Sequence, residues 1–217
     1  QILVQDNSKL NFNAARNFTF MAWIYPNAFT EWSTAYASVT SDCVNGIFVF
    51  AHTSLDGTWG ATEGIAVGIQ PNSGQQINVR SNDSVLTLNK WFHLAVLYNA
   101  SATQANRIRI YINGTEQTST TVVNVGTLGN RDPDTTYLGF DGCTGEYGRM
   151  RIDEAMLFNR TVSLTEIQNI INNQSTRFNH TASELFQNIS LSQSGTLNRV
   201  NVTTNSTLPQ STNISLR

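Results

Sequence analysis

Short apolar stretches that alternate with polar residues, separated by turn-forming residues, run along most of the chain. The clearest case is residues 107–113, where three isoleucines alternate with Arg109 and Tyr111. Such alternation is typical of a strand with one face in the core and the other in solvent. The stretch ends in Asn113 and Gly114, a dipeptide that favours a two-residue hairpin turn.

Other stretches are apolar on both alternating faces, which favours strands that are covered on both sides. The longest spans residues 17–26, where Phe18 and Phe20 face one way and Met21 and Trp23 face the other. Further strands are predicted over residues 46–52, 64–70, 76–80, 90–99, 136–140 and 150–158. Roughly ten to thirteen short strands at hairpin spacing, with almost no helix, indicate an all-β sandwich.

A single helix is predicted over residues 164–172. Ser163 and Glu166 have the spacing of a capping box, in which each side chain binds the backbone N–H of the other residue. The isoleucines that follow repeat at helical spacing and form one apolar stripe. This helix closes the first predicted domain, residues 1–173.

The segment 174–217 differs in composition from the rest of the chain. It contains no Trp or Tyr, although residues 183–191 and 197–204 alternate like strands. A segment of this size with few large apolar side chains cannot bury enough area to offset the conformational entropy lost on folding. We therefore expect a β-rich extension that begins a second β module or pairs with a neighbouring chain.

The balance of charges excludes several classes of partner. Thirteen basic residues stand against fifteen acidic ones, giving a net charge of −2, so no basic footprint for nucleic acid or an anionic membrane is present. No apolar run in the sequence approaches the about 18 to 20 residues of a transmembrane helix. Because the chain starts at Gln1 without a signal peptide, we expect a processed or trimmed piece of a longer protein.

Acceptor sequences for N-glycosylation are unusually frequent. The frequencies of Asn, Ser and Thr predict about five N-x-[ST] sequences by chance, and the chain has eleven. The excess indicates a heavily glycosylated, extracellular surface; the alternative is an Asn- and Thr-rich bacterial protein that is never glycosylated. The acceptors are Asn17, Asn82, Asn99, Asn113, Asn159, Asn173, Asn179, Asn188, Asn201, Asn205 and Asn213.

The two cysteines, Cys43 and Cys143, lie in Gly- and Asp-containing stretches typical of loops. Neither belongs to a CxxC pair and no histidine cluster accompanies them, which disfavours a zinc site. In an exported chain we expect them to form a disulfide. Two buried thiols are the alternative, and they would suit a cytosolic protein.

Five motifs follow one another in a specific order: FTFMAWIYP, KWFHLAVLYN, RIRIYINGTEQ, TYLGFDG and GRMRIDEAMLFNRTVSLTEIQNII. In this order they resemble the laminin G-like, concanavalin A-like lectin/glucanase superfamily, and the closing motif is the most specific. The resemblance covers residues 1–173 and implies an antiparallel two-sheet jelly roll whose usual first strand would lie before Gln1. It does not fix a function, because this fold carries lectins, adhesion modules, enzyme-appended domains and spacers.

The resemblance also directs the search for catalytic and metal sites. Glucanase members use paired carboxylates in an E-x-D-x-x-E pattern, which this sequence lacks, so no catalytic residue is predicted. Family members often hold one Ca²⁺ at a rim of the sandwich through Asp side chains and backbone carbonyls. Asp42 and Asp141 are weak candidates for such a site, and no cofactor is required.

Aromatic and histidine residues offer two further interpretations. Trp32, Tyr36 and Trp59 lie in predicted loops where a sugar could stack, although packing is the more frequent use of such side chains. His93 lies in an apolar strand and is interpreted as a structural residue with satisfied hydrogen bonds. The three histidines share no metal-binding spacing.

Together these patterns favour a non-enzymatic extracellular glycoprotein module, a structural or adhesive component of a cell surface, appendage or filament. Low lysine content and richness in Asn, Thr and Ser suggest an archaeal surface protein or filament, and a virion spike is the alternative. Expected partners are other surface or filament proteins, copies of this chain among them, and glycans. The alternative function is a carbohydrate-binding lectin domain, with or without Ca²⁺.

Overall fold

The computed structural model describes residues 2–5, 17–30, 32–40, 46–52, 63–72, 75–103, 106–117, 120–125 and 135–178. The chain divides into two compact units, Gln1–Ile171 and Asn172–Arg217. The strands predicted over residues 183–191 and 197–204 lie outside the described residues and stay predictions. The described elements are β1 (Ile2–Gln5), β2 (Phe18–Pro26), β3 (Thr34–Val39), β4 (Gly46–His52), β5 (Gly64–Asn72), β6 (Gln75–Arg80), β7 (Phe92–Tyr98), β8 (Ile108–Ile112), β9 (Thr115–Glu116), β10 (Thr120–Val125), β11 (Thr135–Leu138), β12 (Met150–Phe158) and α1 (Leu164–Phe178).

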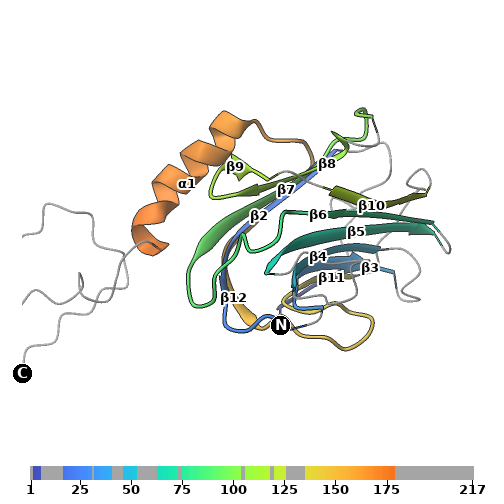
Figure 1. The fold of residues 1–217 in the computed structure, drawn as a ribbon, viewed down its shortest axis with the longest axis horizontal. Coiled ribbons are helices and arrows are strands. Elements are labelled where there is room, and N and C mark those ends of the chain that lie inside the picture. The colour runs from blue at the N-terminus through green and yellow to red at the C-terminus, as the bar shows by residue number, and fades with distance from the viewer. Residues whose placement is uncertain are drawn as a thin grey trace, which may run out of the picture. The chain divides into compact units, whose positions relative to one another are not determined.

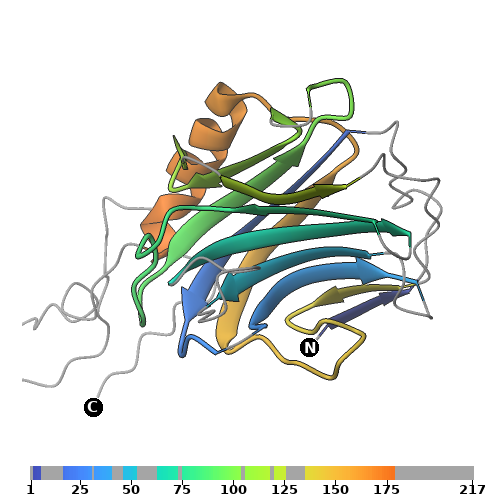
Figure 2. The ribbon, with the colours of Figure 1, turned by 45° about the vertical axis from the view of Figure 1, so that its right-hand side comes forward.

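The first unit is a sandwich of two antiparallel sheets, seen as two layers in Figure 1 and Figure 2. The larger sheet has seven strands in the order β1-β11-β3-β4-β5-β6-β10, and the smaller has five in the order β12-β2-β7-β8-β9. Strands far apart in sequence are neighbours, because β12 pairs with β2 and β1 pairs with β11. The predicted all-β, antiparallel two-sheet jelly roll is confirmed.

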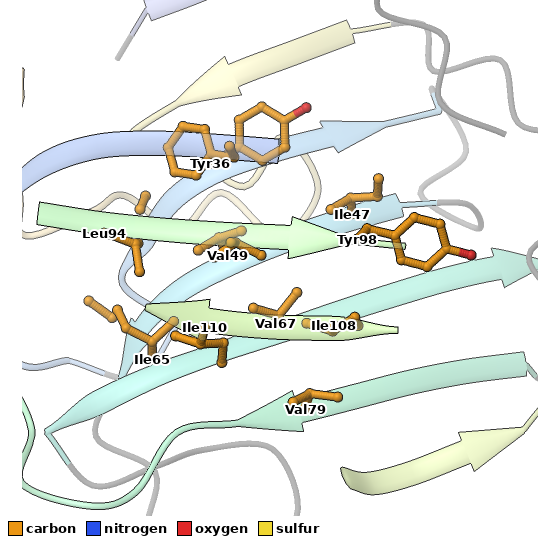
Figure 3. Close-up of a cluster of buried hydrophobic side chains, with 14 of the residues drawn as sticks. Tyr36, Ile47, Val49, Ile65, Val67, Val79, Leu94, Tyr98, Ile108 and Ile110 are labelled. Atoms are coloured by element: carbon orange, nitrogen blue, oxygen red, sulfur yellow. The ribbon is translucent and has the colours of Figure 1, made fainter. Parts of the chain in front are cut away.

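Apolar side chains from both sheets fill the space between the layers (Figure 3). Ile108, Ile110 and Ile112 of β8 all belong to this core, as their alternation predicted. Tyr36 of β3 stacks on Phe20 of β2 with 4.7 Å between ring centroids, which joins the two sheets. Because each large apolar side chain contributes about 1.5–3 kcal/mol on burial, this core is the main source of stability.

The outer face of the five-stranded sheet is apolar as well, because the start of α1 covers it. Met21 of β2 and Tyr111 of β8 pack there with Val162 and Ile167. Strand β2 is thus buried on both faces, which its two-sided apolar pattern predicted. Tyr111, which the alternation of β8 placed in solvent, is only 6% exposed, since the sequence pattern does not show which sheet face a helix covers.

The capping box predicted at the start of α1 is present. Ser163 Oγ accepts a hydrogen bond from the Glu166 N–H at 3.2 Å, and Glu166 Oε2 accepts one from the Ser163 N–H at 2.8 Å. The hydrogen bond from Arg160, together with those from Ser163, lowers the pKa of Glu166 to about 2. The helix continues to Phe178, beyond its predicted end, because no Gly or Pro interrupts residues 172–178.

Strands β1, β3 and β10 were not predicted. The usual first strand of the fold was expected before Gln1, and here the structure differs, because β1 pairs with β11 at an edge of the seven-stranded sheet. At four residues β1 is too short to show a clear alternating pattern. Strand β3 is buried along its whole length, but its small residues carry little apolar signal.

Candidate functional site

A cavity of about 200 Å³ lies where β7, β8 and the segment before α1 come together. Leu97 of β7, which belongs to the outer apolar cluster beneath α1, forms part of its wall. The loop from β7 to β8 and the strand β8 supply most of the remaining side chains. The lining residues are Leu97, Asn99, Ala102, Asn106, Arg107, Arg109 and Thr161.

Hydrogen bonds within the β7–β8 loop hold the rim of this cavity in place. The Asn99 N–H donates to the Arg107 carbonyl at 2.7 Å, and Arg107 Nε donates to the Ala102 carbonyl at 3.3 Å. The Asn106 N–H and its side-chain amide both bind Thr103, at 2.8 and 3.1 Å. These bonds join the described parts of the loop, residues 99–103 and 106–107, independently of any ligand.

The cavity carries two arginines and no acidic side chain in its lining. Arg109 Nη1 lies 3.3 Å from Glu116 Oε2, and the Tyr111 hydroxyl donates to the same oxygen at 3.1 Å. Hydrogen bonding with Tyr111 and the charge of Glu116 raise the pKa of Arg109. Arg107 takes part in none of the ion pairs formed between described residues, so its charge is not neutralised by a carboxylate there.

The carboxylate of Asp153, in β12, accepts a hydrogen bond from the backbone of its own strand. Asp153 Oδ1 accepts a hydrogen bond from the Glu154 N–H at 2.8 Å, at the point where the pairing of β12 with β2 shifts register and Glu154 has a φ of 49°. This is the geometry of a β-bulge stabilised by its own side chain. Within the described residues, no group of three or more His, Cys, Asp or Glu side chains is placed to hold a metal ion.

Asp141, one of the two weak calcium candidates, is 4% exposed and organises its own loop. Its carboxylate accepts hydrogen bonds from the backbone N–H groups of residues 143–146 and from the Thr144 hydroxyl. Because a carboxylate has about four lone-pair positions, these donors leave little capacity for a cation. Asp42, the other candidate, lies outside the described residues, and calcium binding stays a prediction.

The loop of Asp141 also contains Cys143, which packs against the outer face of the seven-stranded sheet beside Val39 and Phe48. Cys143 is disulfide-bonded. Cys43 lies in residues 41–45, outside the described part of the chain. Its pairing with Cys143 therefore stays a prediction.

The aromatic residues considered for sugar stacking do not share a loop surface. Tyr36 lies in β3, not in a loop, and is 1% exposed against Phe20. Trp32 is half-buried with its ring at a steep angle to that of Phe50, 5.3 Å between centroids. Trp59 lies outside the described residues. Packing is thus the observed use of Tyr36 and Trp32.

His93 is fully buried, and its environment differs from the one predicted. Its ring packs at a steep angle against Trp23, with 5.4 Å between centroids. Neither ring nitrogen has a hydrogen-bond partner among the described residues, so the interpretation as a satisfied residue is wrong. Burial lowers its pKa to about 4, and the ring is therefore neutral at pH 7.

Six of the eleven glycosylation acceptors lie in the described residues, and they differ in accessibility. Asn82, Asn113, Asn159 and Asn173 are exposed, whereas Asn17 and Asn99 are half-buried. The remaining five, Asn179, Asn188, Asn201, Asn205 and Asn213, lie outside the described residues.

Asn17 and Thr19, which belong to the same acceptor sequence, form hydrogen bonds with distant parts of the chain. Asn17 Oδ1 accepts a hydrogen bond from the Ala100 N–H at 2.8 Å. Thr19, the hydroxyl residue of the same acceptor, is fully buried and donates to the Arg160 carbonyl at 2.8 Å. The sequence motif could not reveal this use, since the partners lie far away along the chain.

The predicted hairpin at Asn113 and Gly114 is present between β8 and β9, with positive φ values of 51° and 75°. Asn113 Oδ1 accepts a hydrogen bond from the His93 N–H at 2.9 Å. A Cβ atom placed on Gly114 would lie 3.2 Å from Ile171 of α1. The turn therefore lies against α1 at Gly114, although Asn113 itself is exposed.

The architecture and the order of the motifs agree with a known family. The sequence profile described as concanavalin A-like lectin/glucanases superfamily matches residues 3–168. The chain belongs to this superfamily. The match begins within β1 and ends in the first turns of α1, so the whole sandwich is a concanavalin A-like domain.

Similar solved structures include receptor-binding proteins. The binding domain of botulinum neurotoxin serotype G is 17% identical and has a TM-score of 0.57, with 80% of this chain and 40% of that chain covered. The binding domain of botulinum neurotoxin DC, in complex with rat synaptotagmin II, is 16% identical with a TM-score of 0.55 and coverages of 79% and 39%. The same values hold for botulinum neurotoxin type C, whose cell entry depends on interaction with two ganglioside molecules.

These likenesses concern the fold, because identities of 16–17% carry no shared site. This chain spans about two fifths of each toxin chain. A comparison with curated proteins finds no match. Among the described residues, no helix has the length and hydropathy needed to cross a membrane.

Proposed function

We propose that this chain is a non-enzymatic binding module of an extracellular glycoprotein, with a structural or adhesive role on a cell surface, appendage or filament. The observation that carries this proposal is the surface of the sandwich, which presents acceptor asparagines at Asn82, Asn113 and Asn159 in exposed positions. A glycan attached there displaces no packed side chain. The excess of acceptors in the sequence points the same way.

The chemistry of the described residues supports a binding role over catalysis. A glycosidase needs two carboxyl groups facing each other at about 5 to 10 Å. The carboxylate of Asp141 accepts hydrogen bonds from the backbone of its own loop, and that of Asp153 accepts one within the β-bulge. The cavity, which holds arginine and amide groups, has donors for recognition but no carboxylate to act as acid, base or nucleophile.

The glycoprotein proposal is tested on the protein purified from its native source. We expect intact-mass and glycopeptide analysis to find glycans at Asn82, Asn113 and Asn159, and antibody labelling of unpermeabilised cells to place the protein outside. An unmodified chain found inside the cell would overturn the proposal. An archaeal source, copies of this chain as partners and Ca²⁺ as an accessory ion belong to the same proposal.

The second candidate function is that of a carbohydrate-binding lectin domain, which the cavity beside β8 favours. Pockets with an apolar wall and a few convergent polar groups are the common form of small-ligand sites. A glycan array probed with the deglycosylated domain separates the two functions, because an adhesive module that binds proteins gives no glycan signal.

A further inference from the structure

We infer that the cavity between the β7–β8 loop, β8 and Thr161 binds an acidic sugar residue, with its carboxylate on Arg107 and Arg109. The inference rests on the lectin function proposed above and names its ligand class. It concerns the seven lining residues only, all of which lie in the first unit of the chain.

The cavity lining carries the opposite charge to the protein as a whole. The protein as a whole carries a net charge of −2, yet the lining holds two guanidinium groups and no carboxylate. Because opposite charges attract most strongly where solvent is partly excluded, an anion is favoured beside Arg107, whose charge no carboxylate of the described residues neutralises.

Arg107 is bound to the backbone of the β7–β8 loop. Its Nε donates to the Ala102 carbonyl, which fixes the plane of the guanidinium beside the loop. It forms none of the ion pairs seen between described residues, so no carboxylate of those residues occupies its terminal nitrogens. Parallel N–H donors of this kind match a carboxylate bidentately.

Arg109 supplies a second cation on the same side of the strand. Residues two apart in a strand face the same way, about 6.6 Å apart along the chain, so Arg107 and Arg109 flank one space. Glu116 and Tyr111 hold the Arg109 side chain in position. With a fork of five donors, Arg109 can bind an additional oxygen while keeping Glu116.

The remaining lining residues suit a sugar ring better than a bare anion. Asn99, Asn106 and Thr161 offer amide and hydroxyl groups for ring hydroxyls, whereas Leu97 and Ala102 offer an apolar wall for the C–H face of a ring. The volume of about 200 Å³ is below the about 300–1,000 Å³ of pockets for drug-sized ligands. It therefore fits a single monosaccharide unit.

Asn99 is itself a glycosylation acceptor, and a glycan there would stand at the rim of the cavity. The substitution Ser101→Ala removes the acceptor and keeps both Asn99 and the Ser101 N–H that binds Asn99 Oδ1 at 3.0 Å. The binding experiment uses the full chain with this substitution, so that an attached glycan does not occupy the space.

The experiment is an NMR titration with N-acetylneuraminic acid, glucuronic acid, glucose and inorganic sulfate. We expect the two acidic sugars to shift the amides of residues 97–109 and to bind at least tenfold more tightly than glucose or sulfate. Arg107→Ala weakens binding at least tenfold, and Arg107→Lys weakens it severalfold because an ammonium lacks the bidentate fork. Arg80→Ala is the control, since it removes one positive charge outside the cavity.

Several outcomes would overturn the inference. Sulfate binding as tightly as the sugars indicates a plain anion site, and glucose binding as tightly indicates that the carboxylate is not recognised. Unchanged affinity in a folded Arg107→Ala variant places the ligand elsewhere; if that variant unfolds, unchanged affinity in Arg107→Lys, which keeps the charge but not the fork of donors, gives the same decision. A glycan-array signal that survives Arg107→Ala would preserve the lectin function and refute this site.

Discussion

Trp23 and His93 face each other across β2 and β7, at a steep angle and with 5.4 Å between ring centroids. Both side chains are buried, and the imidazole nitrogens have no hydrogen-bond partner among the described residues. An imidazolium would lose its hydration in this position without gaining an acceptor. The pair is therefore stable only while His93 is neutral.

The first prediction is a loss of stability in acid that depends on His93. Its pKa is lowered from 6.5 to about 4 in the folded protein, so the unfolded chain binds more protons between these values. The His93 contribution to the free energy of unfolding is fully present above pH 6.5 and falls by about 3 kcal/mol as the pH drops through 4. Urea unfolding at pH 7, 5.5 and 4 measures it.

The variant His93→Phe isolates this effect from the titration of carboxylates. We expect the difference in stability between wild type and variant to change by about 3 kcal/mol across the pH range. The control is His180→Gln, in the second unit of the chain. An identical pH profile for wild type and His93→Phe would show that His93 does not titrate abnormally.

The second prediction concerns the capping box of α1. Replacing Ser163 by Ala removes the Oγ that accepts the Glu166 N–H, and we expect a loss of about 1 kcal/mol in the free energy of unfolding. Thr165→Ala, at an exposed position two residues later, should change stability by less. Thermal and urea unfolding compare the two variants, and equal effects would argue against the cap as the cause.

The third prediction separates structural from exposed acceptor asparagines. The substitution Asn17→Gln displaces the oxygen that binds the Ala100 N–H and should destabilise the protein by about 1 kcal/mol. Asn82→Gln removes an exposed acceptor and should leave stability unchanged. Both variants lose one acceptor sequence, so unfolding of the unglycosylated forms tests the hydrogen bond alone. Equal stabilities of the Asn17→Gln and Asn82→Gln variants would show that the hydrogen bond between Asn17 and Ala100 does not stabilise the fold.

The fourth prediction addresses the loop of Asp141. Replacing Asp141 by Ala leaves several backbone N–H groups without their acceptor, and we expect a loss of about 2–3 kcal/mol. Glu146→Gln, at an exposed position in the same loop, is the control and should be neutral. A calcium titration of wild type and both variants adds a readout, since a rise in the melting temperature of wild type and Glu146→Gln but not of Asp141→Ala would show that Asp141 binds the ion.

By itself the sequence determined the elements whose physics is local or periodic. The alternation of isoleucines in β8 forced one face inward, Asn113 and Gly114 adopt the positive φ that their turn requires, and Ser163 with Glu166 closed the cap of α1. The order of these elements was enough to indicate the superfamily, because each motif carries its own packing requirement.

Tertiary structure decided everything that depends on contacts between distant segments. It buried Tyr111 under α1 and Tyr36 against Phe20, since no local pattern tells which face of a sheet a helix or a second sheet covers. It turned Asp141 into the acceptor for its own loop. It also placed Arg107 and Thr161, more than fifty residues apart in the sequence, around one cavity. They meet because the segment between β12 and α1 lies beside β8.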